Sequence, residues 1–377
     1  VRRRGHCCPA YVCVTGGIRI PMQILKFLLY FALTVLGMGV LIFVHELGHY
    51  LTARACHVTV HEFSLGMGKR LCGFTSKKTG IQYSLRLLPI GGYVAMAGED
   101  EGGEGAGDPN AFCKKNVWQR MLILAAGAGM NVLTGFLAML ILTAGLTASG
   151  YRLPSTTIEY FAAGAPSYVT GLEKGDTVLR VGDTTVHTGY ELAYEIMFSG
   201  YKPIDVLVER NGDRVLVENV RFPTEAAQGV ALGNMDFQTA PLEPTAWNVV
   251  RAGFWRGVSS IKMVFDSLKG IVTGRFGFSD LSGPIGVTST VTEVAHQPMA
   301  GWNLLYLFAV IAMNLGVFNL LPIPALDGGR LFFRILEVLS FGKPNSPKVE
   351  AKIHSVGMML LLAFTAVIAC KDIFNLF

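Results

Sequence analysis

The sequence has 377 residues, of which 51% are hydrophobic and only 16% charged, and its formal net charge is +5. Soluble globular proteins carry about 25% charged residues, so this composition excludes an ordinary soluble enzyme and indicates a polytopic membrane protein with a water-soluble portion. We therefore expect a lipid bilayer as its surroundings, and no nucleic-acid partner.

The first 21 residues, VRRRGHCCPAYVCVTGGIRIP, differ from the rest of the chain. They contain four arginines and are too weakly apolar to be the hydrophobic region of a signal peptide. Met22 opens MQILKFLLYF, which has the form of an ordinary membrane-protein start. We predict residues 1–21 to be an over-extended N-terminus and assign them no function.

Residues 22–53 are predicted to be the first transmembrane helix. Phe27 to Val44 is a run of 18 uncharged residues, close to the ~20 that cross a bilayer, and HELGH follows it directly. On a helix, positions i and i+4 share a face, so His45 and His49 can bind one ion while Glu46 stands beside it. Zinc hydrolases require this geometry, because a carboxylate must reach the water at the metal.

The membrane setting strengthens the metal hypothesis. HExxH also occurs by chance, but each ionisable residue at the centre of a membrane helix costs about 2.5–3.5 kcal/mol. Three such residues within five positions need a partner that neutralises them, and a divalent ion held by neutral imidazoles is such a partner.

Residues 54–120 are predicted to contain a β-hairpin region and an acidic, glycine-rich loop. The hairpin is indicated by alternating β-forming residues and by turn residues such as Gly91–Gly92.

Residues 121–150 are predicted to form the second span, where Asn131 lies among apolar and small residues. A buried asparagine needs a hydrogen-bond partner, although close helix packing alone would also explain the small residues.

Residues 155–224 have the character of a small soluble α/β domain, with a hairpin around Asn211–Gly212. It holds no nucleophile or ligand cluster, so its expected role is to bind a peptide or to restrict access of substrates to the site.

The segment 242–290 begins with an amphipathic helix, for which we expect a position along the membrane surface. Packing on the preceding domain is the alternative.

The third span is predicted at 298–330 and carries Asp327 after Pro322 and Pro324, which interrupt the helix. The fourth span is predicted at 353–371.

The basic loops 54–120 and 330–352 are expected in the cytoplasm, which would place 155–224 outside. The first and third spans then run in the same direction, so Asp327 and the histidines reach one depth and can complete a tetrahedral zinc site with water.

Four segments together carry a family resemblance: HELGH at His45–His49, NLLPIPALDGGR at Asn319–Arg330, the hairpin ending in Gly91–Gly92–Tyr93, and SGPIG at Ser282–Gly286. With them the chain resembles the bacterial site-2 proteases. These are M50-type intramembrane zinc metalloproteases similar to the regulator of sigma-E protease, and 155–224 would be a single PDZ domain.

The resemblance implies roles for particular residues. His45, His49 and Asp327 would bind Zn2+, and Glu46 would be the general base. Asn319 would help to hold the substrate or the developing oxyanion. Gly91, Gly92 and Asn131 would help to position the substrate. The hairpin that contains the two glycines would do so by pairing with an extended substrate strand at its edge. The implied substrates are membrane proteins with a transmembrane segment, such as anti-sigma factors or remnant signal peptides, in the cytoplasmic membrane.

Two other functions are consistent with parts of this pattern. A non-proteolytic membrane scaffold could capture peptides with its PDZ-like domain and hold zinc structurally, but structural zinc usually has four protein ligands, and only three are found besides Glu46. A metal transporter would need polar residues along a path across both leaflets, whereas the candidates here gather at one depth.

Overall fold

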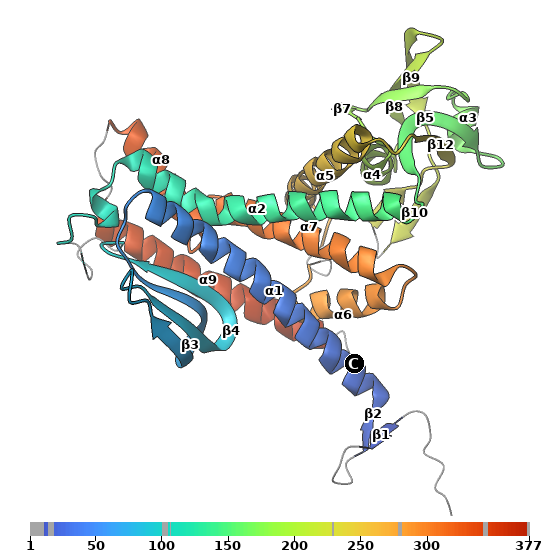
Figure 1. Cartoon of the computed structure of the whole chain (residues 1–377). Helices are drawn as coiled ribbons and strands as arrows, with labels where there is room; N and C mark the ends of the chain where they lie inside the picture. The colour runs from blue at the N-terminus through green and yellow to red at the C-terminus, as the bar shows by residue number, and fades with distance from the viewer. Residues whose placement is uncertain are drawn as a thin grey trace, which may run out of the picture. The chain divides into compact units, whose positions relative to one another are not determined.

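The computed structural model describes residues 11–13, 19–99, 105, 107–227, 230–277, 281–341 and 346–374 (Figure 1). The chain divides into two compact units. The first consists of Val1–Thr134, Ser282–Phe308 and Leu315–Phe377, and the second of Gly135–Leu281 and Ala309–Asn314. Of the predicted N-terminal extension, 1–10 and 14–18 lie outside the described residues, and β1 (Tyr11–Cys13) pairs with β2 (Arg19–Pro21).

Within the described residues, four helices are long and apolar enough to cross a membrane: α1 (Met22–Ala55), α2 (Val117–Ala148), α7 (Ala300–Leu320) and α9 (Pro347–Phe374). The prediction of four membrane-spanning helices in a mixed helix and sheet protein is therefore confirmed. The fourth helix is longer than the predicted 353–371, because its charged residues at both ends continue the helix beyond the apolar run.

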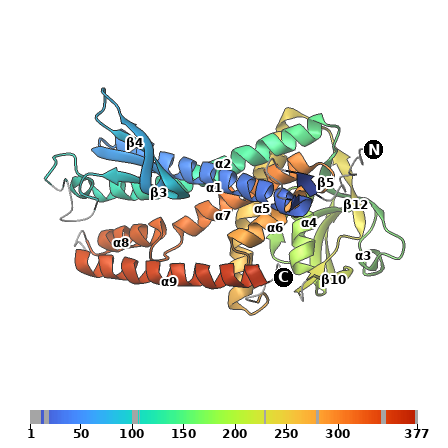
Figure 2. The same cartoon turned by 90° about the horizontal axis from the view of Figure 1, so that it is seen from below.

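A hairpin of two long strands, β3 (Val60–Thr75) and β4 (Gln82–Met96), follows α1 and contacts it (Figure 2). Phe63 and Val94 of the hairpin lie in one buried cluster with Ile123 of α2. This cluster fixes the hairpin next to the helix that carries HELGH. A short 3-10 turn, η1 (Phe112–Lys114), precedes α2.

The remaining helices of the first unit are α6 (Pro284–Ala295) and α8 (Asp327–Leu339). Asp327 is the first residue of α8, because α7 ends before the prolines as predicted and 321–326 is a non-helical loop. Ion pairs fasten α8 to its neighbours. Glu337 accepts from Arg120 of α2 at 2.5 Å, and Arg334 pairs with Glu350 of α9.

The second unit contains an antiparallel sheet of order β12-β5-β6-β8-β9, with β7 paired to β6. The strands are β5 (Leu153–Phe161), β6 (Thr177–Val181), β7 (Thr184–Thr185), β8 (Ile204–Arg210), β9 (Asp213–Val220) and β12 (Phe237–Leu242). The sheet therefore also takes in a strand beyond residue 224. The other elements are α3 (Pro166–Val169), α4 (Gly189–Ser199), β10 (Thr224–Ala227) and β11 (Val230–Gly233).

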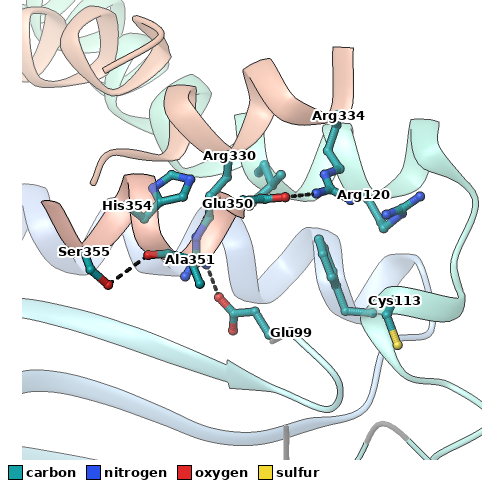
Figure 3. A pocket seen from close by; sticks show the side chains of 11 residues that line it. Glu99, Cys113, Arg120, Arg330, Arg334, Glu350, Ala351, His354 and Ser355 are labelled. Carbon is teal, nitrogen blue, oxygen red and sulfur yellow. Dashed lines mark hydrogen bonds and ion pairs between the residues drawn. The ribbon is translucent and has the colours of Figure 1, made fainter. Parts of the chain in front are cut away.

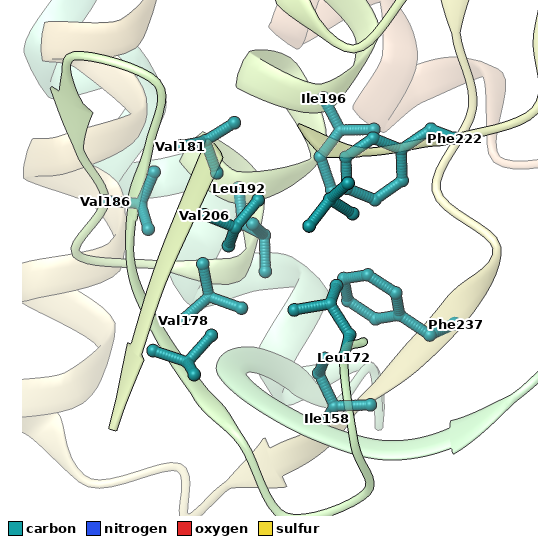
Figure 4. Packing of buried hydrophobic residues seen from close by; sticks show 12 residues of the cluster. Ile158, Leu172, Val178, Val181, Val186, Leu192, Ile196, Val206, Phe222 and Phe237 are labelled. Atoms are coloured by element: carbon teal, nitrogen blue, oxygen red, sulfur yellow. The ribbon is translucent and has the colours of Figure 1, made fainter. Parts of the chain in front are cut away.

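Alternating residues of these strands and the apolar face of α4 form one hydrophobic core (Figure 4). Leu192 and Ile196, four residues apart on α4, are fully buried against Val178 and Val206 of the sheet. The predicted hairpin is confirmed, since Arg210 pairs with Asp213 across Asn211 and Gly212. Both turn residues have positive φ, 53° and 91°, as a two-residue hairpin turn requires.

The amphipathic helix α5 (Ala246–Val272) packs on α4 within this unit. The ring of Trp255 stacks on His187 with centroids 3.6 Å apart, and Lys262 pairs with Glu195 at 2.8 Å. Part of its polar face is thus occupied by protein. These contacts favour packing on the preceding domain over the predicted position along a membrane surface.

Candidate metal centre

Three side chains from two distant parts of the chain converge on one point. His45 Nε2 lies 2.9 Å from Asp327 Oδ2, His49 Nε2 lies 3.2 Å from the same oxygen, and the two imidazole nitrogens are 3.2 Å apart. Four ligands about 2.0–2.1 Å from a tetrahedral zinc ion are about 3.3 Å from one another. Among the described residues this is the one group of three His, Cys, Asp or Glu side chains that could hold a metal.

The protein orients His49 through its other ring nitrogen. His49 Nδ1 lies 2.8 Å from the carbonyl oxygen of Ile123, so Nδ1–H donates there and the lone pair of Nε2 points at the shared point. A Cβ built on Gly127 would overlap the same ring. His49 is only 8% exposed, and α2 therefore fixes both the position and the tautomer of this candidate ligand.

Asn131 lies against His45, with Nδ2 3.3 Å from Nδ1 of the ring. The amide is fully buried, and its Oδ1 has no hydrogen-bond partner among the described residues. Turning the amide by 180° exchanges its two ends, so that Oδ1 accepts from His45 Nδ1–H. That orientation gives the buried Oδ1 a donor and leaves Nε2 of His45 free to bind a metal.

Asp327 reaches the histidines from the first turn of α8. Its Oδ2 lies within 3.2 Å of Nε2 of both imidazoles. A carboxylate in this position is a suitable ligand for a metal.

Glu46 faces the same cavity, about 740 Å³ in volume, as the three donors. Gly92 of β4 also lines it, and a Cβ built there would lie 2.8 Å from Glu46 Cγ. A side chain at this position would push the carboxylate aside. Gly91 does not contact Glu46 in this way. Its φ of 80° is a backbone conformation that suits glycine, and its nearest neighbour is Met67.

Asn319 stands apart from the other predicted site residues. It is half-buried one residue before the end of α7 and is not among the described residues that line the cavity. Sequence reasoning overlooked the contact between Gly127 and His49. A signal was present, because Gly127 and Asn131 are four residues apart and share one face of α2, as His45 and His49 do on α1.

Two imidazoles and a carboxylate, with a glutamate beside them and apolar helices around them, define the class of membrane-embedded zinc hydrolases. Residues 33–364 match the profile of peptidase family M50. The chain therefore belongs to this family and is an intramembrane zinc metalloprotease, as the resemblance implied.

Named relatives cover almost the whole chain. A candidate zinc metalloprotease of Clostridium acetobutylicum is 33% identical over 343 residues, which cover 90% of this chain and 96% of that protein. The regulator of sigma-W protease RasP of Bacillus subtilis is 28% identical over 419 residues, covering 90% and 97%. The zinc metalloprotease RasP of Geobacillus kaustophilus is 27% identical over 415 residues, covering 90% and 96%.

Proposed function

We propose that His45, His49 and Asp327 hold the zinc ion and that Glu46 is the general base for hydrolysis of peptide bonds in or near transmembrane segments. The observation that carries this assignment is the convergence of three donor atoms within 3.2 Å of one another, although His49 and Asp327 are 278 residues apart in the sequence. Neutral imidazoles and a carboxylate suit zinc, and a fourth position remains for water.

Zinc, when bound, supplies a Lewis acid that activates water and polarises the scissile carbonyl group. Glu46 takes the proton from the attacking water as the C–O bond forms. It later passes that proton to the amine nitrogen as the C–N bond breaks, so the carboxylate returns to its starting state. Gly92 keeps the space beside Glu46 open for this exchange.

The substrate segment must be extended, because a transmembrane helix hides its amides in hydrogen bonds. The β3–β4 sheet offers a place for such a segment. Ser64 pairs with Ser84 on one side and with Tyr93 on the other, so Gly92–Met96 is an outer segment of the sheet and also lines the cavity. An unwound substrate would add to this edge as a further strand.

The basic loops support a position of the metal centre toward the cytoplasmic side of the cell membrane and of the PDZ-like domain, 155–224, on the outer side. From there the domain would bind peptides or restrict access. Anti-sigma factors and remnant signal peptides fit as substrates, since both present a single transmembrane segment. The relation of the Bacillus subtilis relative to sigma-W, which its name states, favours the former.

Reconstitution with a single-span model substrate in lipid vesicles tests this function. We expect cleavage within or next to the transmembrane segment, faster when the segment contains helix-breaking residues. Cleavage confined to a soluble, unfolded protein, with the membrane substrate left intact, would contradict the proposal.

A further inference from the structure

The loop that carries Asp327 to the metal centre is held in a strained conformation. Ala325, two residues before Asp327, has a φ of 82°, in the region that residues with a Cβ rarely adopt. Pro322 and Pro324 stand in the same loop and have no N–H groups with which to anchor it. Such a conformation persists only where the surrounding structure holds it.

His354 of α9 supplies that support at the strained residue itself. Its Nδ1 lies 3.1 Å from the backbone nitrogen of Ala325, so the N–H of Ala325 donates to the imidazole. A ring that accepts at Nδ1 carries its proton on Nε2 when neutral. That Nε2 is buried and has no hydrogen-bond partner among the described residues, which leaves the bond to Ala325 as the polar contact of this side chain.

A second residue of α9, Gly357, also packs closely against the loop. A Cβ built on Gly357 would overlap Pro324, and one built on Gly329 of α8 would lie 3.1 Å from Cε1 of His354. His354 and Gly357 are three residues apart and therefore share one face of the helix. Figure 3 shows the His354 ring beside Arg330 among the side chains that line a second cavity, about 360 Å³ in volume.

We propose that His354 is a positioning residue for the metal centre: by accepting from Ala325 N–H it holds the loop 321–326 so that Asp327 points at His45 and His49. This role rests on the proposed function of Asp327 as a zinc ligand. The fourth membrane helix is then part of the machinery that sets zinc affinity, and more than an anchor in the bilayer.

Zinc affinity of the purified full-length protein, measured by competition with a chelator, tests the proposal without depending on activity. His354→Leu keeps the bulk of the ring but removes the acceptor, and we expect about tenfold weaker zinc binding, the lower end of the range for groups that support a ligand. His354→Asn places Oδ1 where Nδ1 stands and should stay close to wild type. His354→Gln carries its polar atoms one bond further and should resemble the leucine variant.

Two matched controls separate a local effect from general loss of packing. His296→Leu is the control for His354→Leu: it makes the same change at an exposed histidine at the end of α6 and should leave zinc affinity unchanged.

Gly357→Ala is a second test of the same contact and should weaken zinc binding by displacing Pro324. Its control is Gly39→Ala, at a helical glycine with open space around it, which should leave zinc affinity unchanged.

Equal zinc affinities of the leucine, asparagine and wild-type proteins would overturn the role of His354. So would an asparagine variant as weak as the glutamine variant. Failure of the metal assignment gives a different result, because Asp327→Asn would then keep its zinc. If Asp327→Asn loses zinc while every His354 variant keeps it, the inference about His354 alone is wrong.

Discussion

Gly127 of α2 faces His49 of α1 so closely that a Cβ on the glycine would overlap Nε2 of the imidazole. The same two helices meet again one turn away, where Asn131 contacts His45. The second membrane helix thus touches both histidines of HELGH, at two positions of its own that are four residues apart. It therefore limits the positions that both rings can take.

The first prediction concerns this glycine. Gly127→Ala should displace the His49 ring and lower zinc affinity about tenfold to hundredfold, since an imidazole that cannot keep its orientation binds metal poorly. Gly129→Ala is the matched control, because a Cβ there meets nothing within 4 Å. Chelator competition on the two purified variants measures the difference, and equal affinities would show that the contact has no influence on the metal centre.

Glu46→Gln should give a folded protein that retains its zinc but has lost proteolysis by about 10³-fold or more, because the amide cannot accept a proton from water. Zinc content and the rate of cleavage of a model transmembrane substrate should be measured on one preparation. A variant that still cleaves the substrate at the wild-type rate would exclude Glu46 as the base.

Asn131 should be required for the orientation of His45. Asn131→Leu removes the acceptor for Nδ1–H and should weaken zinc binding about 10-fold to 100-fold, whereas Asn131→Asp restores an acceptor and should bind more tightly than the leucine variant. This ranking distinguishes a contact to the ligand from simple filling of space. If both variants bind zinc as well as wild type does, Asn131 has no part in holding His45.

The sheet of the second unit contains a structural ion pair that can be tested separately. Arg210 donates to Asp176 at 2.7 Å, and the Asp176 side chain is 0% exposed. Arg210→Met leaves that carboxylate buried without its charged partner and should destabilise the domain by about 2–3 kcal/mol, less than a fully buried pair because Arg210 is 22% exposed.

Limited proteolysis of the full-length protein during heating follows this domain. The control is Arg214→Met, which alters an exposed arginine on the adjacent strand and should change stability by no more than about 0.5 kcal/mol. Equal resistance of the two variants would show that the pair between Arg210 and Asp176 contributes nothing.

The convergence of His45, His49 and Asp327 could be predicted because its signals are local. HELGH has helical spacing, and Asp327 follows prolines that end an apolar helix. The supports around them could not, because they depend on how helices face one another. Gly127 in an apolar run fits helix packing equally well. His354 accepts from a backbone N–H that is available to it only because α7 has ended before Ala325. The place of α5 was uncertain for a similar reason, since one amphipathic pattern suits both a membrane surface and a protein surface.

The measurement that bears most directly on the whole account is the zinc stoichiometry and affinity of the purified protein compared with Asp327→Asn. The account predicts one zinc ion per wild-type chain, bound at least about tenfold more weakly after a change that removes the charge of one of the three ligands. An unaltered zinc content and affinity in Asp327→Asn would contradict a metal centre shared by the first helix and the loop that precedes α8.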